Sequence, residues 1–381
     1  MIKTVGIISA HYLPHLGGVE RYVHNLADHL SARGYRIIII TSCLSGMKQK
    51  ETDGDIGIFR LPCYELMGGR LPVVRPDRVF RDMVRQLGDI FFDWMIVNTR
   101  LYILSAWASQ YCKKNNIPMF LIEHGTAHMH FSNFVICKTG ELYEHMLTAY
   151  IKKRCKTFYG VSGACNEWLL HFGIHAAGVL YNAVHVEEYG DTHTDYRDRL
   201  KLEKEDVIIA FTGRLIREKG IMKLVRAFLT LEGMEKNVWL VIAGDGDLAG
   251  EICQLNHSHI LMLGSIPHKE VIQLLREADI YCLPTDYPEG FPTAVLEAAM
   301  CKCCIVATGN GGTKELIVDD TYGYILKENT VCEIGKCLEK AVSDTRAAAQ
   351  MAKKAHQRVL ERFTWDHTIN TLEKLWEGRN G

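Results

Sequence analysis

The stretch "TVGIISAHYLPHLGGVERYVHNLADHLSARGYRIIIITS", Thr4–Ser42, decides the fold class. Within it, "TVGIISA" is typical of a buried strand, "HYLPHLGG" of a loop, and "YRIIIITS" after Gly34 of a second buried strand. Apolar side chains between the strands recur at the spacing of one helix face: Val19, Tyr22, Val23, Leu26, Ala27 and Leu30. A strand, a loop, a helix and a strand in this order predict a βαβ unit of a parallel sheet.

The same pattern begins again near Asp206. Here "DVIIAFTG" predicts a strand, "RLIREKG" a loop and "VWLVIAG" the next strand, and "HILMLG", "IYCLP" and "CIVAT" predict three more. The helix between the first two strands has one apolar face: Ile221, Leu224, Val225, Phe228 and Leu229. We therefore expect an α/β protein with two Rossmann-like, doubly wound parallel-sheet domains, joined by the polar segment 181–206. Ligands of such sheets bind beyond the carboxyl ends of the strands, so two facing sheets predict a central cleft.

Composition excludes several classes of function. The formal net charge is −1, which is no signature of nucleic-acid binding. The 13 cysteines lack disulfide-framework spacing, and the opening "MIKTVGIISAHYLP" resembles no secretory signal, so free thiols in a cytoplasmic protein are expected. The CxxC spacing in "CKCC", Cys301–Cys304, has no matching second pair, and buried or inert cysteines are the favoured interpretation over metal or redox use.

Two cations follow the first strand of the second domain. "FTGRLIREKG" places Arg214 and Lys219 between that strand and the next helix. Two such cations beside a helix start suit a diphosphate, although a solvated loop with two surface charges is the plain alternative.

Two glutamates follow in "EGFPTAVLEAAM". Pro292 and Thr293 mark a helix start, so the backbone N–H groups of Gly290–Ala294 could hold an anion. Glu289 in the loop and Glu297 in the helix could each accept hydrogen bonds from sugar hydroxyls. Glu297 could instead stabilise the helix terminus, and a glycosidase-like carboxylate pair is a rival use that would leave the cations unexplained.

Together these motifs resemble the retaining glycosyltransferases of family four, which have the two-domain GT-B fold. The resemblance covers nearly the whole chain, through "HYLPHLGGVERY", "IEHGT", "VSGACNEWL", "YNAVHVEEY", "TGRLIREKG", "LVIAGDGD", "EGFPTAVLEA", "GNGGTKELI" and "RFTWD". It implies an N-terminal acceptor-binding domain at 1–183 and a C-terminal nucleotide-sugar donor-binding domain at 184–363. It also implies that the tail 364–381 crosses back to the first domain, although a final helix packed only on the second domain is the plain alternative.

The resemblance also implies roles for individual residues. Arg214 and Lys219 would bind the donor pyrophosphate and stabilise the leaving nucleoside diphosphate. Glu297 would hold the ribose hydroxyls, and Glu289 would contact the donor sugar. Backbone N–H groups would cradle phosphate and sugar at Gly290, Phe291, Pro292 (which has a carbonyl only), Thr293 and Ala294.

Three motifs lie outside that cluster, and the one that carries Glu315 matches more weakly. Gly17 and Gly18 would let the first loop approach the diphosphate, unless they form an ordinary strand-to-helix turn. His124 would sit near the far hydroxyls of the sugar, although a histidine after a strand is more often just a satisfied polar residue. Glu315 would lie at a helix start near the donor, with structural capping equally compatible.

The family implies no cofactor and no metal beyond the substrate, a UDP- or GDP-linked sugar. Retention of the anomeric configuration is implied too, and the acceptor would be a glycan or a lipid-linked saccharide in cell-surface polysaccharide or glycoconjugate synthesis. Its binding would fall to the first domain, for which the His- and Tyr-rich segment 127–158 is a candidate. A sugar-nucleotide epimerase and a non-catalytic sugar-nucleotide-binding protein remain alternatives, whereas a dinucleotide oxidoreductase would want a GxGxxG motif that "PHLGGVE" lacks.

Membrane contact is a separate question. Five arginines stand among apolar residues in "GRLPVVRPDRVFRDMVRQL": Arg70, Arg75, Arg78, Arg81 and Arg85. A basic amphipathic face can lie on an anionic membrane, so we weigh peripheral contact with its inner face against an ordinary solvated helix face.

Overall fold

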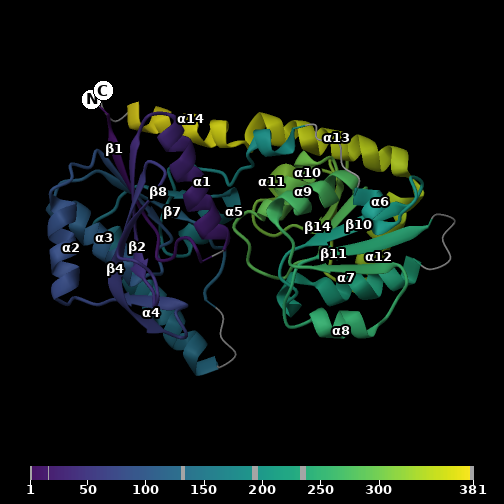
Figure 1. Ribbon diagram of the computed structural model, residues 1–381, viewed down its shortest axis with the longest axis horizontal. Coiled ribbons are helices and arrows are strands. Elements are labelled where there is room, and N and C mark those ends of the chain that lie inside the picture. Colours follow the sequence, from purple (N-terminus) through teal and green to yellow (C-terminus); the bar gives the residue numbers. More distant parts are fainter. Residues whose placement is uncertain (1, 16, 130–133, 191–195, 232–236, 378–381) are drawn as a thin grey trace. The chain divides into compact units, whose positions relative to one another are not determined.

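The computed structural model describes residues 2–15, 17–129, 134–190, 196–231 and 237–377 (Figure 1). The chain divides into two compact units, which we call unit 1 (Met1–Asn182 with Thr368–Gly381) and unit 2 (Ala183–His367). Each unit holds one mainly parallel sheet covered by helices, so the α/β class expected from the two βαβ patterns is confirmed.

The sheet of unit 1 is built on seven parallel strands in the described residues. Their order is β4-β2-β1-β6-β7-β8-β9, and β3 (Lys50–Asp53) and β5 (Leu71–Val74) pair antiparallel with β4. The parallel strands are β1 (Thr4–Ile8), β2 (Arg36–Cys43), β4 (Ile56–Leu66), β6 (Trp94–Asn98), β7 (Met119–Glu123), β8 (Phe158–Gly160) and β9 (Gly178–Val179). Strands buried on both faces need continuous apolar runs, which explains "RIIIITS" and "WMIVN".

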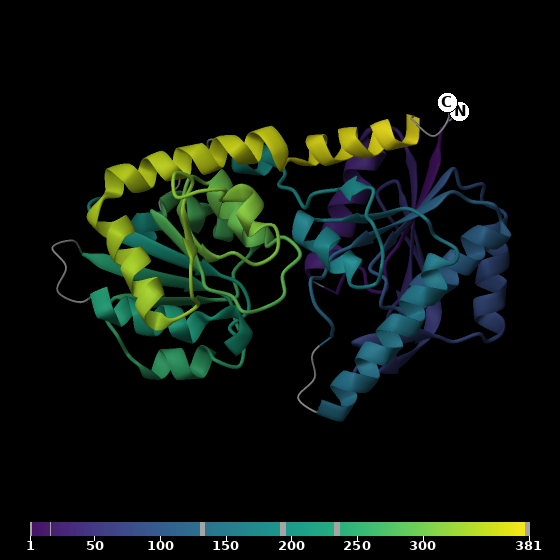
Figure 2. The same ribbon diagram turned by 180° about the vertical axis from the view of Figure 1, so that it is seen from behind.

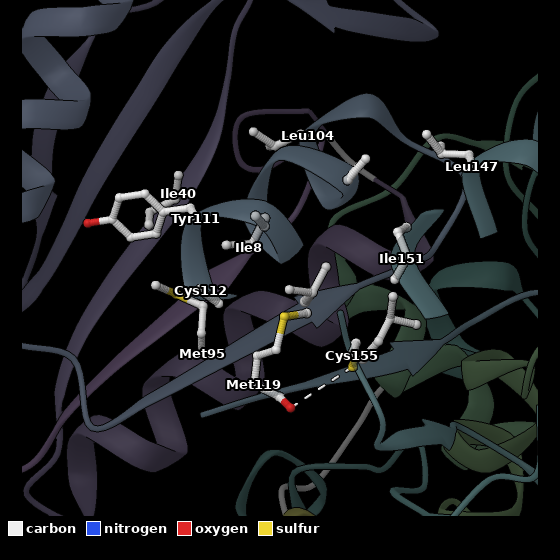
Figure 3. Packing of buried hydrophobic residues seen from close by; sticks show 14 of the residues in the cluster. Ile8, Ile40, Met95, Leu104, Tyr111, Cys112, Met119, Leu147, Ile151 and Cys155 are labelled. Carbon is white, nitrogen blue, oxygen red and sulfur yellow. Dashed lines mark hydrogen bonds between the residues drawn. The ribbon is translucent and has the colours of Figure 1, made fainter. Parts of the chain in front are cut away.

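Helices cover both faces of this sheet (Figures 1 and 2). One apolar core joins alternate strand residues to helices on one face, and α1 (Gly18–Ala32) lies on the opposite face. The helices of that core are α2 (Arg78–Gly88), α3 (Ile103–Lys114), α4 (Phe134–Lys152) and α5 (Gly163–Leu170). Figure 3 shows part of it, where the Cys155 thiol points to the Met119 carbonyl at 4.0 Å.

Unit 2 has a six-stranded parallel sheet in its described part, with the order β12-β11-β10-β13-β14-β15. The strands are β10 (Val207–Thr212), β11 (Val238–Ala243), β12 (Ile260–Gly264), β13 (Ile280–Leu283), β14 (Cys304–Thr308) and β15 (Tyr324–Leu326). The helices are α6 (Tyr196–Leu200), α7 (Ile221–Phe228), α8 (Ala249–Gln254), α9 (His268–Glu277), α10 (Thr293–Met300), α11 (Thr313–Leu316), α12 (Val331–Ser343) and α13 (Thr345–Arg362). The segment predicted as a polar linker contains α6 and the short 3-10 helix η1 (Val186–Tyr189).

In both sheets the order of the strands reverses at the first strand of the unit. In unit 1 the chain winds outward from β1 through β2 and then restarts at β6 on the other side; in unit 2 the same happens at β10 and β13. This is the strand order of dinucleotide-binding folds, whose ligands sit at the carboxyl ends of the two strands flanking the reversal. The loops after β10 and β13 are therefore the first place to look for a site in unit 2.

The C-terminal helix α14 (Trp365–Glu377) begins in unit 2, and its residues from Thr368 onward belong to unit 1. Within unit 1, Trp376 is 1% exposed and its ring stacks on Trp94 at 5.7 Å and meets Tyr35 edge-on at 5.1 Å. Glu373 forms an ion pair with Arg33 at 3.0 Å. The end of the chain is therefore part of the unit 1 core.

We expect Trp376→Ala to destabilise unit 1 by about 3–5 kcal/mol, since it removes a fully buried aromatic ring and leaves a cavity. Urea unfolding followed by tryptophan fluorescence measures this. Lys374→Ala, on the exposed side of the same helix, is the matched control and should stay within about 0.5 kcal/mol of the wild type. Equal stability of the two variants would show that the tail does not support unit 1.

Candidate functional site

The loop after β10 is anchored by a glycine. Gly220 follows η2 (Arg217–Lys219) with φ +74°, and a Cβ there would lie 1.8 Å from the carbonyl oxygen of Pro284. Only glycine permits this approach, because the contact is with backbone that cannot move aside. The loop carrying Lys219 is thus pressed against the end of β13.

The loop after β13 bonds back to the same place. The backbone N–H groups of Asp286 and Tyr287 donate to the carbonyl of Glu218 at 2.7 and 3.1 Å. The Tyr287 ring lies 5.9 Å from the guanidinium carbon of Arg214 and 5.2 Å from Nζ of Lys219. The structure therefore brings both predicted cations around one aromatic ring.

Glu289 completes this cluster by an ion pair with Lys219. Both side chains are largely buried, at 17% exposure for Lys219 and 13% for Glu289. Arg214 is exposed and has no carboxylate partner within the described ranges. Lys219 is therefore held in place by a carboxylate, while the guanidinium of Arg214 can meet an anion from solvent.

The loop after β14 fixes the start of α10. Gly311 has φ +57°, and a Cβ there would lie 2.5 Å from the carbonyl oxygens of both Glu289 and Gly290. The N–H of Gly312 donates to Gly290 at 2.9 Å. Phe291 is buried, and Pro292 occupies the N-cap of α10 without any side-chain acceptor. The backbone of Gly290–Ala294 is thus held rigidly beside Glu289.

Glu297 lies farther along α10 and has a partner that the sequence did not reveal. Its carboxylate is buried and accepts a hydrogen bond from Nε2 of His268 at 2.9 Å. Nδ1 of His268 lies 3.6 Å from Glu188. His268 is the first residue of α9, just beyond the carboxyl end of β12, so its position at the same sheet edge was the available signal.

His124 belongs to unit 1 and follows β7. Asn98 ends β6, and its amide nitrogen donates to the carbonyl of Ile8 at 3.2 Å. Its amide oxygen therefore accepts from Nε2–H of His124 at 2.9 Å, while the Tyr22 ring packs edge-on against the imidazole at 4.8 Å. Burial lowers the pKa of His124 to about 3, so the ring is neutral near pH 7.

Gly17 and Gly18 also belong to unit 1, at the start of α1. Gly17 is extended, and a Cβ there would meet only the movable carboxylate of Glu20, at 2.3 Å. Nothing lies within 4 Å of a Cβ at Gly18. The described chain itself does not require glycine at position 18, so any requirement has to come from a ligand.

Comparison with known proteins identifies the family. Residues 16–188 match the family described as Glycosyltransferase Family 4, and residues 192–358 match Glycosyl transferases group 1. The chain belongs to the group 1 glycosyltransferases. It is therefore a transferase enzyme with the GT-B fold, as the motifs implied.

Relatives of this glycosyltransferase span its whole length. It is 24% identical to an uncharacterized glycosyltransferase of Methanocaldococcus jannaschii, covering 99% of this chain and 98% of the relative. It is also 24% identical to the phosphatidylinositol N-acetylglucosaminyltransferase GPI3 subunit of Saccharomyces cerevisiae, covering 97% and 82%. Among solved structures, Anabaena Alr3699/HepE in complex with UDP has a TM-score of 0.79 at 17% identity, covering 99% and 100%, and it was also solved with UDP-glucose.

The predicted site residues of the glycosyltransferase fall into two groups. Arg214, Lys219 and Glu289 meet around Tyr287, and Gly290–Ala294 and Glu297 continue from them along α10 in unit 2. Glu315 lies in the first turn of α11, where its backbone carbonyl accepts from Arg358. The second group lies in unit 1. Gly17 and Gly18 follow β1 there, and His124 follows β7.

The CxxC motif in "CKCC" has a structural explanation. Cys301 and Cys304 in the CxxC motif are free, and burial raises the pKa of each thiol to about 12, so neither is poised as a thiolate ligand.

The arginine-rich stretch carries its own counter-charges, as Arg75 pairs with Asp77 at 2.7 Å and Arg85 with Asp82 at 3.2 Å. Within the described residues, no helix is both long and apolar enough to cross a bilayer.

We expect His124→Gln to weaken the acid sensitivity of unit 1. The pKa of His124 is lower in the folded protein than the 6.5 of a free histidine, so protons favour the unfolded chain. Its contribution is fully present above pH 6.5 and is lost as the pH falls toward 3. As the pH falls through this range, the difference between the unfolding free energies of wild type and variant should shrink by at most about 1.4 kcal/mol per pH unit.

Urea unfolding at pH 7, 6, 5 and 4 measures this, followed by tryptophan fluorescence because four of the six tryptophans lie in unit 1. His175→Gln, at an exposed histidine of the same unit, is the control. Parallel pH profiles for wild type and His124→Gln would contradict the assignment of a neutral, partly buried imidazole.

Proposed function

We propose that this glycosyltransferase moves a sugar, with retention of configuration, from a UDP- or GDP-linked donor to a glycan or lipid-linked saccharide acceptor. The reaction would serve cell-surface polysaccharide or glycoconjugate synthesis. The observation that carries the proposal is the meeting of Arg214, Lys219 and Glu289 around Tyr287 beyond β10 and β13. The UDP and UDP-glucose complexes of a protein with the same fold support a nucleotide sugar as donor.

The cations suit the charge that develops during transfer. When the bond from the anomeric carbon to the diphosphate breaks, negative charge grows on the leaving phosphate oxygen. Fixed positive groups then stabilise the transition state more than the bound donor, which raises kcat rather than affinity alone. Lys219 is suited to this because Glu289 and Gly220 hold it in place before any donor arrives.

The two glutamates would bind the two sugars of the donor. Glu297 would accept hydrogen bonds from ribose hydroxyls, and His268 orients it by occupying Oε1. Glu289 would contact the transferred sugar while keeping its pair with Lys219. Neither glutamate then has to act as a general acid, which distinguishes this arrangement from a glycosidase pair.

Unit 1 would bind the acceptor, and unit 2 the donor. In unit 1, Nε2–H of His124 donates to Asn98, so the neutral ring would have Nδ1 to accept a hydrogen bond from a sugar hydroxyl. The open space beside Gly18 is compatible with close approach of a ligand to the backbone. A relative named as a phosphatidylinositol N-acetylglucosaminyltransferase subunit supports a lipid-linked acceptor.

Peripheral contact with the inner face of a membrane would suit such an acceptor in a cytoplasmic enzyme. Helix α4 fits it better than the charge-paired α2, because large apolar side chains are exposed along one side of it: Val135, Leu142, Met146 and Tyr150. Basic residues follow at its end, in "IKKRCK". Apolar side chains flanked by cations are typical of helices that lie on anionic bilayers.

We expect Lys219→Ala and Arg214→Ala each to lower kcat about 10²–10³-fold, the effect of removing one transition-state charge contact, with a smaller change in donor affinity. Steady-state transfer from UDP- and GDP-sugars to an acceptor mixture measures kcat, and isothermal titration measures donor affinity. Lys223→Ala removes a neighbouring ion pair, to Asp286 at 2.7 Å, and is the matched control. An unchanged kcat with a raised KM would contradict the role, and epimerised donor as the product would indicate an epimerase.

We expect turnover to persist without magnesium or manganese, since two cations and a helix start already face the proposed diphosphate position. Activity after EDTA treatment and desalting measures this. Loss of turnover that Mg²⁺ or Mn²⁺ restores would count against the donor site.

A further inference from the structure

Three histidines outside the proposed donor site gather their ring nitrogens in unit 1. His128 lies in the loop after β7, His145 on α4 and His171 at the C-terminal end of α5. One ring nitrogen from each lies within 4.8 Å of the others. Three segments separated along the chain therefore present imidazole groups to one point.

A buried ion-pair network orients the first of these rings. Glu144 is fully buried and accepts from Arg100 Nη1 at 3.2 Å, from the N–H of Met129 at 2.8 Å and from Nδ1 of His128 at 3.1 Å. A carboxylate only accepts, so Nδ1 of His128 carries a proton, and in the neutral ring Nε2 then holds the lone pair. Metal-ligating histidines almost always donate their other ring N–H to a carboxylate, a backbone carbonyl or water, and here the acceptor is the carboxylate of Glu144.

The spacing of one pair of ring nitrogens matches two ligands of one metal ion. Nε2 of His128 and Nε2 of His171 lie 3.2 Å apart. Two nitrogens at about 2.05 Å from a tetrahedral zinc ion would be about 3.3 Å apart, the edge of the tetrahedron. The alternative is a single hydrogen bond between these two nitrogens, which would not involve the ring of His145.

Aromatic side chains pack around the three imidazole rings. Trp168 stacks on His171 at 4.8 Å, and Phe172 packs against His128 and His145. These contacts hold the three rings close to one another.

We propose that His128, His145 and His171 bind a divalent transition metal, best Zn²⁺, with three ring nitrogens and an open fourth position. Imidazole ligands select zinc, nickel or copper over magnesium and manganese. The ion joins the loop after β7 to α4 and α5. The site is independent of the proposed transfer reaction, because metal binding itself is its readout.

Zinc titration of the full chain tests the proposal, after EDTA treatment and desalting into reducing buffer. We expect one tight site in the wild type and at least a tenfold rise in Kd in His145→Ala and in His171→Ala, since even loss of an outer partner costs 10–100-fold. Both side chains are exposed, so these variants should fold. His175→Ala, an exposed histidine four residues beyond His171, is the matched control and should bind as the wild type does.

Two further measurements separate this site from other zinc ligands. Cys253 and Cys332 are exposed in unit 2 and can bind zinc weakly, but the control variant retains them. Co²⁺ at the proposed site should give visible absorption bands of a tetrahedral ion without charge-transfer bands from thiolate. Saturating Zn²⁺ should also raise the Tm of the wild type and of His175→Ala only. Equal zinc affinity in all four proteins, or thiolate bands with Co²⁺, would overturn the proposal.

Discussion

The parallel ladder of unit 2 is the constraint on which its proposed donor site depends. β10 and β13 are hydrogen-bonded neighbours, Ile209 opposite Ile280, although about 70 residues separate them in the chain. Because both strands run the same way, the loops that leave them emerge at the same edge. Gly220 then presses one loop onto the other at Pro284, a contact that a residue with a Cβ could not make. The cation-bearing loop and the glutamate-bearing loop share one position for this reason.

Charge pairing explains how the site remains stable without its substrate. A largely buried lysine or glutamate costs free energy unless it has a partner, and Lys219 and Glu289 provide for one another. Glu297, buried on α10, has His268 in the same way. Arg214 differs because it is exposed, so water can solvate its charge. The site thus consists of two satisfied carboxylates and one guanidinium that is open to solvent.

Unit 1 uses the same strand order for different chemistry. The carboxyl ends of β1, β6 and β7 meet through Asn98, which bonds to Ile8 and to His124. Beside them, Glu123 and Arg100 form a buried ion pair at 3.1 Å, and Arg100 continues to Glu144 and the histidine cluster. The cations differ between the units, because Arg100 in unit 1 is buried in ion pairs whereas Arg214 in unit 2 is exposed. The same strand order therefore carries a buried polar network in unit 1 and a solvent-facing guanidinium in unit 2.

The sequence by itself determined the fold class and most of the residues that meet in unit 2. Apolar runs such as "RIIIITS" are typical of strands buried on both faces, and the 3.6-residue period around Tyr22 is typical of a helix that covers such a sheet. The cations and glutamates could be predicted to lie in one site because loops after strands of one parallel sheet share an edge. Only the tertiary structure decided which side chains touch. Lys219 pairs with Glu289, and Glu297 accepts a hydrogen bond from His268, so the two glutamates have separate partners.

The tertiary structure also decided the features that depend on contacts between distant segments. The buried network of Arg100, Glu144 and His128 joins residues from three segments, and no local period records such a meeting. The same holds for Trp376, whose ring stacks on Trp94 more than 280 positions earlier in the chain. Local patterns specify helices and strands because those depend on near neighbours. Side-chain partners depend on how the elements pack, which sequence spacing alone does not contain.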